Sequence, residues 1–236
     1  MPFSFTYGGR SSGELLATWP FQRAAEDLDP QRVRHTITWR DPETALSVRC
    51  VAVEYRDFPV IEWTLYLRNE GTAQSPLLDG LQALDTRVER RADGEFLLHH
   101  NVGSPCEARD YQPLQTALGP DAHLHIGAAG GRSTNSDLSY FNLELSGGQG
   151  LIVAIGWPGQ WASEWTRDGG RGLRITAGQE LLHTKLLAGE EIRSPLVALQ
   201  FWQGDWERAQ NVWRKWFIAH NIRRPGGQLP WTQWCG

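Results

Sequence analysis

The sequence predicts a mostly β fold, a large antiparallel β-sandwich followed by one C-terminal amphipathic helix. Three observations support this prediction. Apolar and polar residues alternate in short runs over roughly the first 200 positions, turn residues interrupt these runs, and helical spacing occurs only after Gly204. The turns are rich in glycine, of which the chain has 25. About ten or more short strands with almost no helix are typical of two packed sheets.

The expected strands follow one another with turn residues between them. In residues 60–68 apolar and polar side chains alternate, and turn sequences precede the run at 56–59 and follow it at 69–71. A similar alternation occurs in residues 33–39. The other strands are expected at residues 46–55, 95–99, 123–128, 141–145, 151–156, 173–176, 182–187 and 196–202.

The helix is expected from Trp206 to about Asn221. Asp205 is a helix-capping residue type, and apolar residues recur at spacings of three and four as far as Trp216. The Pro-Gly-Gly sequence at 225–227 ends the pattern. A Trp-rich helix before such a linker indicates a bridge to a further domain. The expected domains are a sandwich at 1–204, a linker helix at 205–222 and a Pro/Gly linker at 223–236.

Composition excludes several classes of protein. The 23 basic and 27 acidic residues leave a net charge of −4, which argues against a nucleic-acid partner. No apolar run approaches the roughly 18 residues of a membrane span. The N-terminal sequence lacks the features of a signal peptide. Three widely spaced cysteines (Cys50, Cys106 and Cys235) fit a reducing compartment, so a cytoplasmic protein is expected.

Tryptophan is unusually frequent, with 12 residues in the chain. An indole can stack its apolar face on a sugar ring while its N–H binds a hydroxyl group. Trp157, Trp161 and Trp165 are spaced four apart, and Pro158-Gly159 interrupts the chain between the first two. At least one of these rings is therefore expected at a loop, beside Gln160. Two interpretations stay open: core packing against the opposite sheet, or an aromatic edge that faces a sugar or another domain.

The sequence gives little support for a metal site or for a catalytic cysteine. His123 and His125 stand two apart on an expected strand, so both face one side and are candidate metal ligands with Asp121 or with His99 and His100. Histidines at this spacing are more often ordinary surface or core residues, so no metal and no cofactor are expected. Cys50 is expected to be buried and Cys106 exposed, and no spacing links either thiol to a base.

Paired carboxylates, the signature of glycoside hydrolysis, are not singled out by any spacing. The candidates in loops or at strand ends are Asp57, Asp79, Asp110, Glu164 and Asp168. Chance alone explains five such residues among 27 acids. No catalytic residue is therefore assigned, and Asp57 and Glu164 remain the candidates.

Several segments resemble the melibiase-type α-galactosidases of glycoside hydrolase family 36, in the same order and with similar spacing. The resemblance extends from the start of the chain to about Pro230. The segments are FSFTYGGR at 3–10 with Leu15, Leu16 and Trp19, DFPVIEW at 57–63, FNLE at 141–144, GWPGQW at 156–161 and AQNVWR at 209–214.

The resemblance implies an N-terminal beta-supersandwich. In that family this domain precedes a (β/α)8 barrel whose two aspartates, a nucleophile and a general acid/base, cleave α-galactosides with retention. The present chain has no Lys-Trp-Asp-like motif and is expected to stop where the barrel would begin, so no catalytic residue is transferred. The implied partners are an α-galactoside, a catalytic barrel and further copies in a homo-oligomer. The implied sugar-facing residues are Asp57, Phe58, Trp157, Gln160 and Trp161.

Three functional hypotheses follow from the sequence. The leading one is a non-catalytic accessory domain of an α-galactosidase-like protein, used for barrel docking, oligomerisation and sugar contact. The second is a stand-alone carbohydrate-binding module, motivated by the tryptophan content. The third is a small glycosidase that uses sandwich-loop carboxylates such as Asp57 and Glu164.

Overall fold

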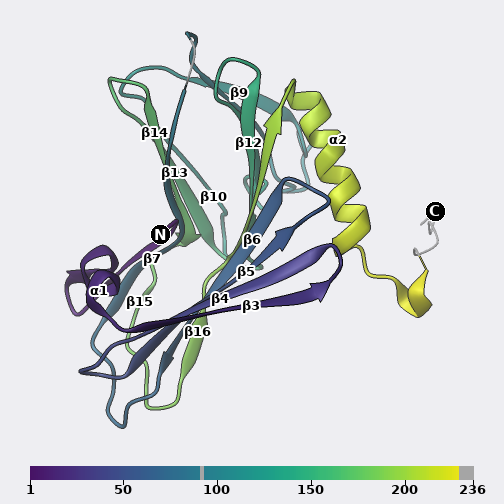
Figure 1. Ribbon diagram of the computed structural model, residues 1–236. Coiled ribbons are helices and arrows are strands. Elements are labelled where there is room, and N and C mark those ends of the chain that lie inside the picture. The colour runs from purple at the N-terminus through teal and green to yellow at the C-terminus, as the bar shows by residue number, and fades with distance from the viewer. Residues whose placement is uncertain (91–92, 229–236) are drawn as a thin grey trace.

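The protein is a sandwich of two antiparallel sheets with a helix laid along its outside (Figure 1). A computed structural model describes residues 1–90 and 93–228. Within these residues the strands form one ten-stranded and one seven-stranded sheet, as the sequence predicted for a mostly β fold. None of the helices in the described part of the chain is long and apolar enough to cross a membrane.

The ten-stranded sheet carries the helix on its outer face. Its strands, in spatial order, are β3 (Phe21–Asp29), β4 (Arg32–Arg40), β5 (Leu46–Tyr55), β6 (Val60–Asn69), β17 (Leu196–Gln203), β12 (Gln149–Gly156), β11 (Tyr140–Glu144), β8 (Phe96–Asn101) and β9 (Pro113–Leu118), and β16 (Glu191–Arg193) pairs with β6. The central strand β17 pairs with β12 on one side and with β6 on the other, so residues far apart in the sequence meet there.

The seven-stranded sheet closes the other side of the sandwich. Its strands are β10 (His123–Gly127), β13 (Trp161–Arg167), β14 (Gly172–Gln179), β7 (Leu78–Glu89), β1 (Ser4–Tyr7) and β2 (Arg10–Ser11), and β15 (His183–Thr184) pairs with β7. A short helix, α1 (Ser12–Thr18), follows β2, and the Ser11 side chain caps its N-terminus.

Aromatic side chains join the two sheets. Phe141 on β11 meets Trp161 and Trp165 of β13 edge-on, with ring centroids 6.0 and 5.2 Å apart. All three side chains are fully buried. Trp63 on β6 reaches across in the same way, and its indole N–H donates to the Ala83 carbonyl on β7 at 2.9 Å. Core packing therefore accounts for much of the tryptophan content, since each large ring buries about 150–250 Å².

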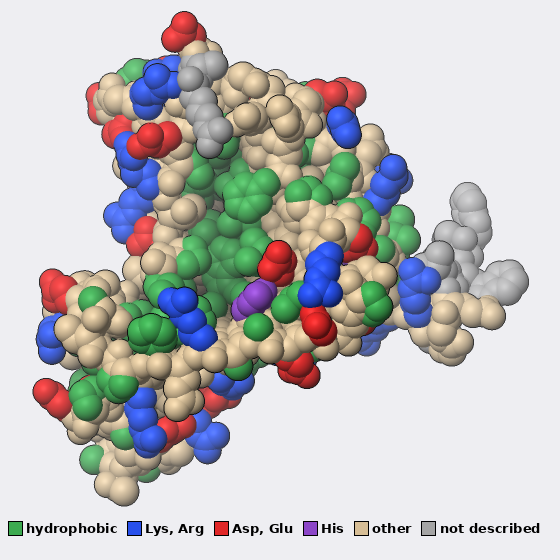
Figure 2. All heavy atoms as spheres, viewed as in Figure 1, with side chains coloured by type: hydrophobic (Ala, Val, Ile, Leu, Met, Phe, Trp, Pro, Cys, Tyr) green, Lys and Arg blue, Asp and Glu red, His purple; other side chains and the backbone are tan. Residues whose placement is uncertain are grey.

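The two sheets diverge at one end of the sandwich. There β3, β4 and β5 lean away from β7 and leave a hollow of about 830 Å³, with Trp39 and Trp63 among its lining residues. Figure 2 shows hydrophobic side chains gathered in this hollow. The strand β3 lies on the free edge of the sheet, and its residues from Phe21 to Asp27 are exposed.

The C-terminal helix has the length that the sequence predicts, in two parts. α2 (Trp206–Trp216) is a regular α-helix, and a π-helical turn continues it over Phe217–Asn221. The expected strand at 182–187 is wrong in extent, because only two of its residues pair, as β15. Leu182 and Leu186 are nevertheless buried in the core. Residues 229–236 of the predicted linker lie outside the described residues.

Candidate functional site

The helix α2 is held on the ten-stranded sheet by two buried amide side chains. The Asn142 amide donates to the carbonyl of Trp206 at 3.1 Å, and the Gln200 amide donates to the carbonyl of Ala209 at 2.9 Å. Both amides are fully buried. The Asp205 carboxylate caps the helix at 2.6 Å from a first-turn N–H, as its residue type predicts. The helix is therefore fixed in position at its start.

A second cluster fixes the end of the helix. The Tyr55 hydroxyl donates to the Glu62 carboxylate at 3.1 Å, and Trp216 packs edge-on against the Tyr55 ring. Burial raises the pKa of Glu62 and of Tyr55. On the following turn His220 lies against Tyr55, and its Nε2 is 2.9 Å from the Asp57 carboxylate. Side chains from β5, β6 and the end of the helix thus form one polar cluster, against which Trp216 packs.

Asp57 and Phe58, two of the expected sugar-facing residues, belong to this cluster. Phe58 packs edge-on against the His220 ring, with the ring centroids 5.8 Å apart. The Asp57 carboxylate is hydrogen-bonded to Nε2 of the same ring. Their observed contacts therefore hold the helix against the β5–β6 turn.

A pocket of about 570 Å³ opens along the other side of α2. It lies between the helix and strands β8, β9 and β11. Its lining residues are His99, His100, Asn101, Pro113, Leu114, Gln115, Tyr140, Trp206, Gln210, Trp213 and Arg214. Its volume falls in the range of roughly 300–1,000 Å³ that is usual for small-molecule sites.

His99 contacts three neighbouring side chains in this pocket. Its ring stacks on Trp206 with centroids 4.3 Å apart and planes 17° from parallel. The Gln115 amide lies 3.2 Å from Nδ1, and the Glu144 carboxylate lies 2.7 Å from Nε2. An amide N–H can only donate to Nδ1, so Nε2 carries the proton and donates to Glu144. Because both ring nitrogens of His99 are hydrogen-bonded, the ring helps to hold Trp206, Gln115 and Glu144 in position.

Glu164, a candidate carboxylate, lies between the two candidate metal ligands. His123 Nε2 and His125 Nδ1 are 3.0 and 2.5 Å from its oxygens, across the pairing of β10 with β13. His99 and His100 lie on β8 in the other sheet and do not complete this cluster. Among residues 1–90 and 93–228, no three His, Cys, Asp or Glu side chains are arranged to hold a metal ion.

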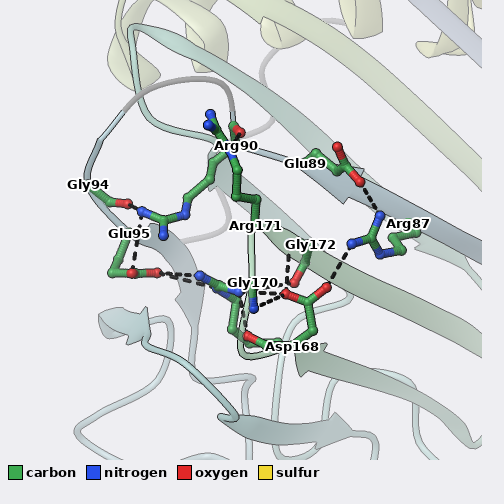
Figure 3. A network of polar contacts seen from close by, with 10 residues as sticks. Arg87, Glu89, Arg90, Gly94, Glu95, Asp168, Gly170, Arg171 and Gly172 are labelled. Carbon is green, nitrogen blue, oxygen red and sulfur yellow. Dashed lines mark hydrogen bonds and ion pairs between the residues drawn. The ribbon is translucent and has the colours of Figure 1, made fainter.

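Asp168 has a structural position in the turn between β13 and β14 (Figure 3). Its carboxylate accepts from two N–H groups of that turn and from Arg87 of β7 at 2.7 Å. The hydrogen bond from Arg87 is the main reason that the pKa of Asp168 falls to about 2. The neighbouring Arg167 is fully buried and pairs with both Asp168 and Glu95. This network joins β7, β13 and the start of β14 in the seven-stranded sheet to Glu95, which directly precedes β8 of the other sheet.

The remaining candidate carboxylates also have partners nearby in the structure. Asp110 accepts a hydrogen bond from the Ser104 hydroxyl at 2.8 Å, and Asp79 lies 3.4 Å from His183. Cys106 is exposed, as expected. Cys50 is partly buried, and burial raises the pKa of its thiol to about 11.

The expected aromatic edge at 157–161 divides into buried and accessible parts. Trp161 is fully buried, and its indole N–H donates to the Ser133 carbonyl, so the core covers the ring and leaves no face for a sugar. Trp157 is half-buried in the loop, with the Arg193 guanidinium 5.2 Å above its ring. Gln160 bridges two loops through Gly131 and Glu180.

The structure does not bring the two expected sugar-facing segments together. Gly156, before the Trp157 loop, pairs with Leu196 at one end of β17. Val60, after the Asp57 turn, pairs with Gln200 toward the other end. The two segments therefore continue beyond opposite ends of this strand.

The end of the helix exposes apolar side chains. Phe217 and Ile218 are 47% and 41% exposed. Together with Trp213 and Arg214 they line a shallow depression of about 330 Å³. Such a surface beside a rigid helix is suited to packing against another protein surface.

Comparison with known proteins identifies the fold. No family model and no curated protein matches the sequence. A variant of the α-galactosidase AgaA of Geobacillus stearothermophilus in complex with raffinose, a family 36 enzyme, superposes with a TM-score of 0.72 over 94% of this chain, at 13% identity. The fold is that of the N-terminal third of a family 36 α-galactosidase.

Two further solved structures have a similar fold. The α-galactosidase of Lactobacillus brevis matches 94% of this chain with a TM-score of 0.70 and 16% identity. The α-N-acetylgalactosaminidase NagBb of Bifidobacterium bifidum matches 95% with a TM-score of 0.56 and 10% identity. The chain covers 33%, 33% and 34% of these three proteins, so it spans about a third of their length.

Sequence reasoning missed the residues that build the α2 surroundings. Glu62 was noted only as part of the DFPVIEW segment, His220 carried no motif, and His99 was considered only as a metal ligand. One signal was available, because Trp206, Gln210 and Trp213 recur at spacings of four and three and must share a helix face.

Proposed function

We propose that this chain is the N-terminal, non-catalytic domain of an α-galactosidase-like glycoside hydrolase. The observation that carries the proposal is the likeness to the N-terminal third of family 36 α-galactosidases over 94% of the chain. The contacts of the candidate carboxylates agree with it. Asp57 and Glu164 are both engaged by histidines and lie on different sheets, which suits structural roles better than a catalytic pair.

Its role would be to dock a catalytic barrel through the end of the helix. Phe217 and Ile218 provide an apolar contact there, and the Asp57–His220 cluster beneath keeps the contact rigid. A rigid surface loses little conformational freedom on docking, which favours association. The whole protein would act on α-galactosides in the cytoplasm, with the sugar bound mainly by the barrel.

The same proposal includes a homo-oligomer. The free edge of β3 and the apolar hollow beside it support this part, because unpaired edges and large apolar surfaces are common contact regions between subunits.

Two measurements test the proposed role. The purified chain should not hydrolyse a chromogenic α-galactoside, and turnover that disappears in Glu164→Gln would overturn the non-catalytic role. The chain should also bind a family 36 α-galactosidase that lacks its own N-terminal third, as measured by calorimetry. The double variant Phe217→Glu/Ile218→Glu should abolish this binding.

A matched control distinguishes specific docking from non-specific binding through exposed apolar side chains. Leu181 is 91% exposed and lies on another part of the surface, in the turn before β15. Leu181→Glu should leave the binding unchanged. Binding that resists the double variant, or that Leu181→Glu weakens equally, would overturn the docking surface.

A further inference from the structure

We propose that the pocket between α2 and strands β8, β9 and β11 binds a neutral saccharide. None of its lining residues was a sugar candidate from the sequence. The inference does not rest on a catalytic barrel, because every residue of the pocket belongs to this chain.

Only some of the tryptophans are accessible to a ligand. Ten of the twelve lie in the described residues. The buried ones are Trp19, Trp39, Trp63, Trp161, Trp165 and Trp216. The partly exposed ones are Trp157, Trp202, Trp206 and Trp213.

Two of these four lie outside this pocket. Arg193 lies over the Trp157 ring, and the Trp202 ring packs directly on the backbone of Gly150. The other two, Trp206 and Trp213, line the same pocket, where Trp206 stacks on His99 and Trp213 also packs against Trp216.

Trp206 and Trp213 lie on the face of α2 that forms one wall of the pocket. Trp206, Gln210, Trp213 and Arg214 all line the pocket, at spacings of four, three and one. Aromatic rings therefore alternate with hydrogen-bonding side chains along one wall. Sugar rings need this combination, because apolar C–H groups and hydroxyl groups occur side by side on them.

Strands β8 and β9 form the opposite wall of the pocket. Strand β9 contributes Gln115, whose side chain is exposed, and β8 contributes Asn101, which is half-buried. Stacking against Trp206, a hydrogen bond from the Gln115 amide to Nδ1 and a hydrogen bond from Nε2 to Glu144 hold the His99 ring between the two walls. Planar amides on both walls can donate to and accept from hydroxyl groups without a rearrangement of the pocket.

The charge of the lining selects the class of ligand. Arg214 is the one lining residue with a permanent charge in the described part of the chain, and it lies exposed at the rim. A phosphate site normally gathers several cationic or backbone N–H donors, and an apolar ligand would leave the remaining hydrogen-bonding capacity of the amides unused. A neutral polyhydroxylated ring satisfies both the aromatic and the amide groups.

The test follows the indole N–H signals of the whole chain by NMR, assigned with Trp206→Phe and Trp213→Phe. The probes are methyl α-galactopyranoside, methyl α-glucopyranoside and methyl β-glucopyranoside, with inorganic phosphate and indole as competing classes. At least one glycoside should shift the Trp206 and Trp213 signals saturably, with a dissociation constant of about 0.1–10 mM because the pocket is open and the contacts are few.

Two variants at one position make the test decisive. Gln210→Ala should keep the fold, since alanine favours helix, and should weaken binding about 3- to 10-fold through the loss of a hydrogen bond. Gln210→Trp should fill the pocket and abolish binding. Trp157→Ala, which alters the other partly exposed indole, should leave the affinity unchanged.

Three results would overturn the inference. The first is the absence of a saturable shift at Trp206 and Trp213 with all three glycosides. The second is binding that survives Gln210→Trp. The third is a saturable response to phosphate or to indole in place of the glycosides.

Discussion

The Asp57 carboxylate lies 2.9 Å from His220 Nε2, although 163 positions separate the two residues in the sequence. The contact joins the turn between β5 and β6 to the π-helical turn that follows α2. A residue expected from the family resemblance to face a sugar thus contacts the end of the helix in this structure. Because the His220 side chain is only 11% exposed, solvent screens this pair less than a surface pair.

We expect the Asp57–His220 contact to contribute measurably to stability. A double-mutant cycle with Asp57→Asn and His220→Gln should give a coupling energy of roughly 0.5–1 kcal/mol, near the upper end for partly exposed pairs. Urea unfolding of the four proteins measures it. The exposed pair Arg34–Glu26 is the control and should couple less. Equal coupling in the two cycles would contradict a special role for the helix contact.

The stability contributed by Asp168 should depend on pH in the acid range. Its pKa in the folded protein is about 2, below the ordinary value near 3.8, because Arg87 and turn N–H groups bind the charged form. The unfolded chain therefore takes up the proton first as the pH falls. The contribution is complete above about pH 4 and disappears as the pH falls toward 2.

The variant Asp168→Asn tests this dependence. It should be less stable than the wild type at pH 6, and the difference should shrink between pH 4 and pH 2. Urea unfolding at pH 6, 4 and 3 measures the difference directly. Glu107→Gln, an exposed carboxylate paired with Arg109 in a loop, is a suitable control. A difference that stays constant with pH would show that the Asp168 charge is not responsible.

The two tryptophans at 157 and 161 should differ sharply in their effect on stability. Trp161→Ala removes a fully buried ring and should cost about 3–5 kcal/mol of unfolding free energy. Trp157→Ala removes a half-buried ring and should cost less than about 2 kcal/mol. Chemical denaturation of both variants at neutral pH provides the comparison. Similar losses in the two variants would be inconsistent with the observed burial.

Local patterns predicted much of the fold, and their failures have physical causes. Strand β5 (Leu46–Tyr55) has the predicted limits, because it is a continuous run of strand-forming residues bounded by turn residues on both sides. Strand β7, the longest in the described residues, was not predicted. Gly80 has a positive φ there, and its pairing with β14 shifts register near Gln82, so the alternation of period two is interrupted.

The candidate site was predicted less well than the fold. The sequence identified a capped helix with regularly spaced tryptophans, and the structure contains it at α2. It did not reveal that Asn142 and Gln200 anchor that helix, because a buried amide in a strand looks like any other polar residue in an alternating pattern.

By itself, the sequence determined the local features of this protein: the class of fold, most of the strands and the start of the helix. These depend on residues close together in the chain, through alternation, turn chemistry and capping. Only the tertiary structure decided which tryptophans are buried, that Asp57 meets His220, and that Trp206 and Gln115 line one pocket. Those relationships arise where strands distant in sequence pair, and no local pattern records which distant segment a residue will meet.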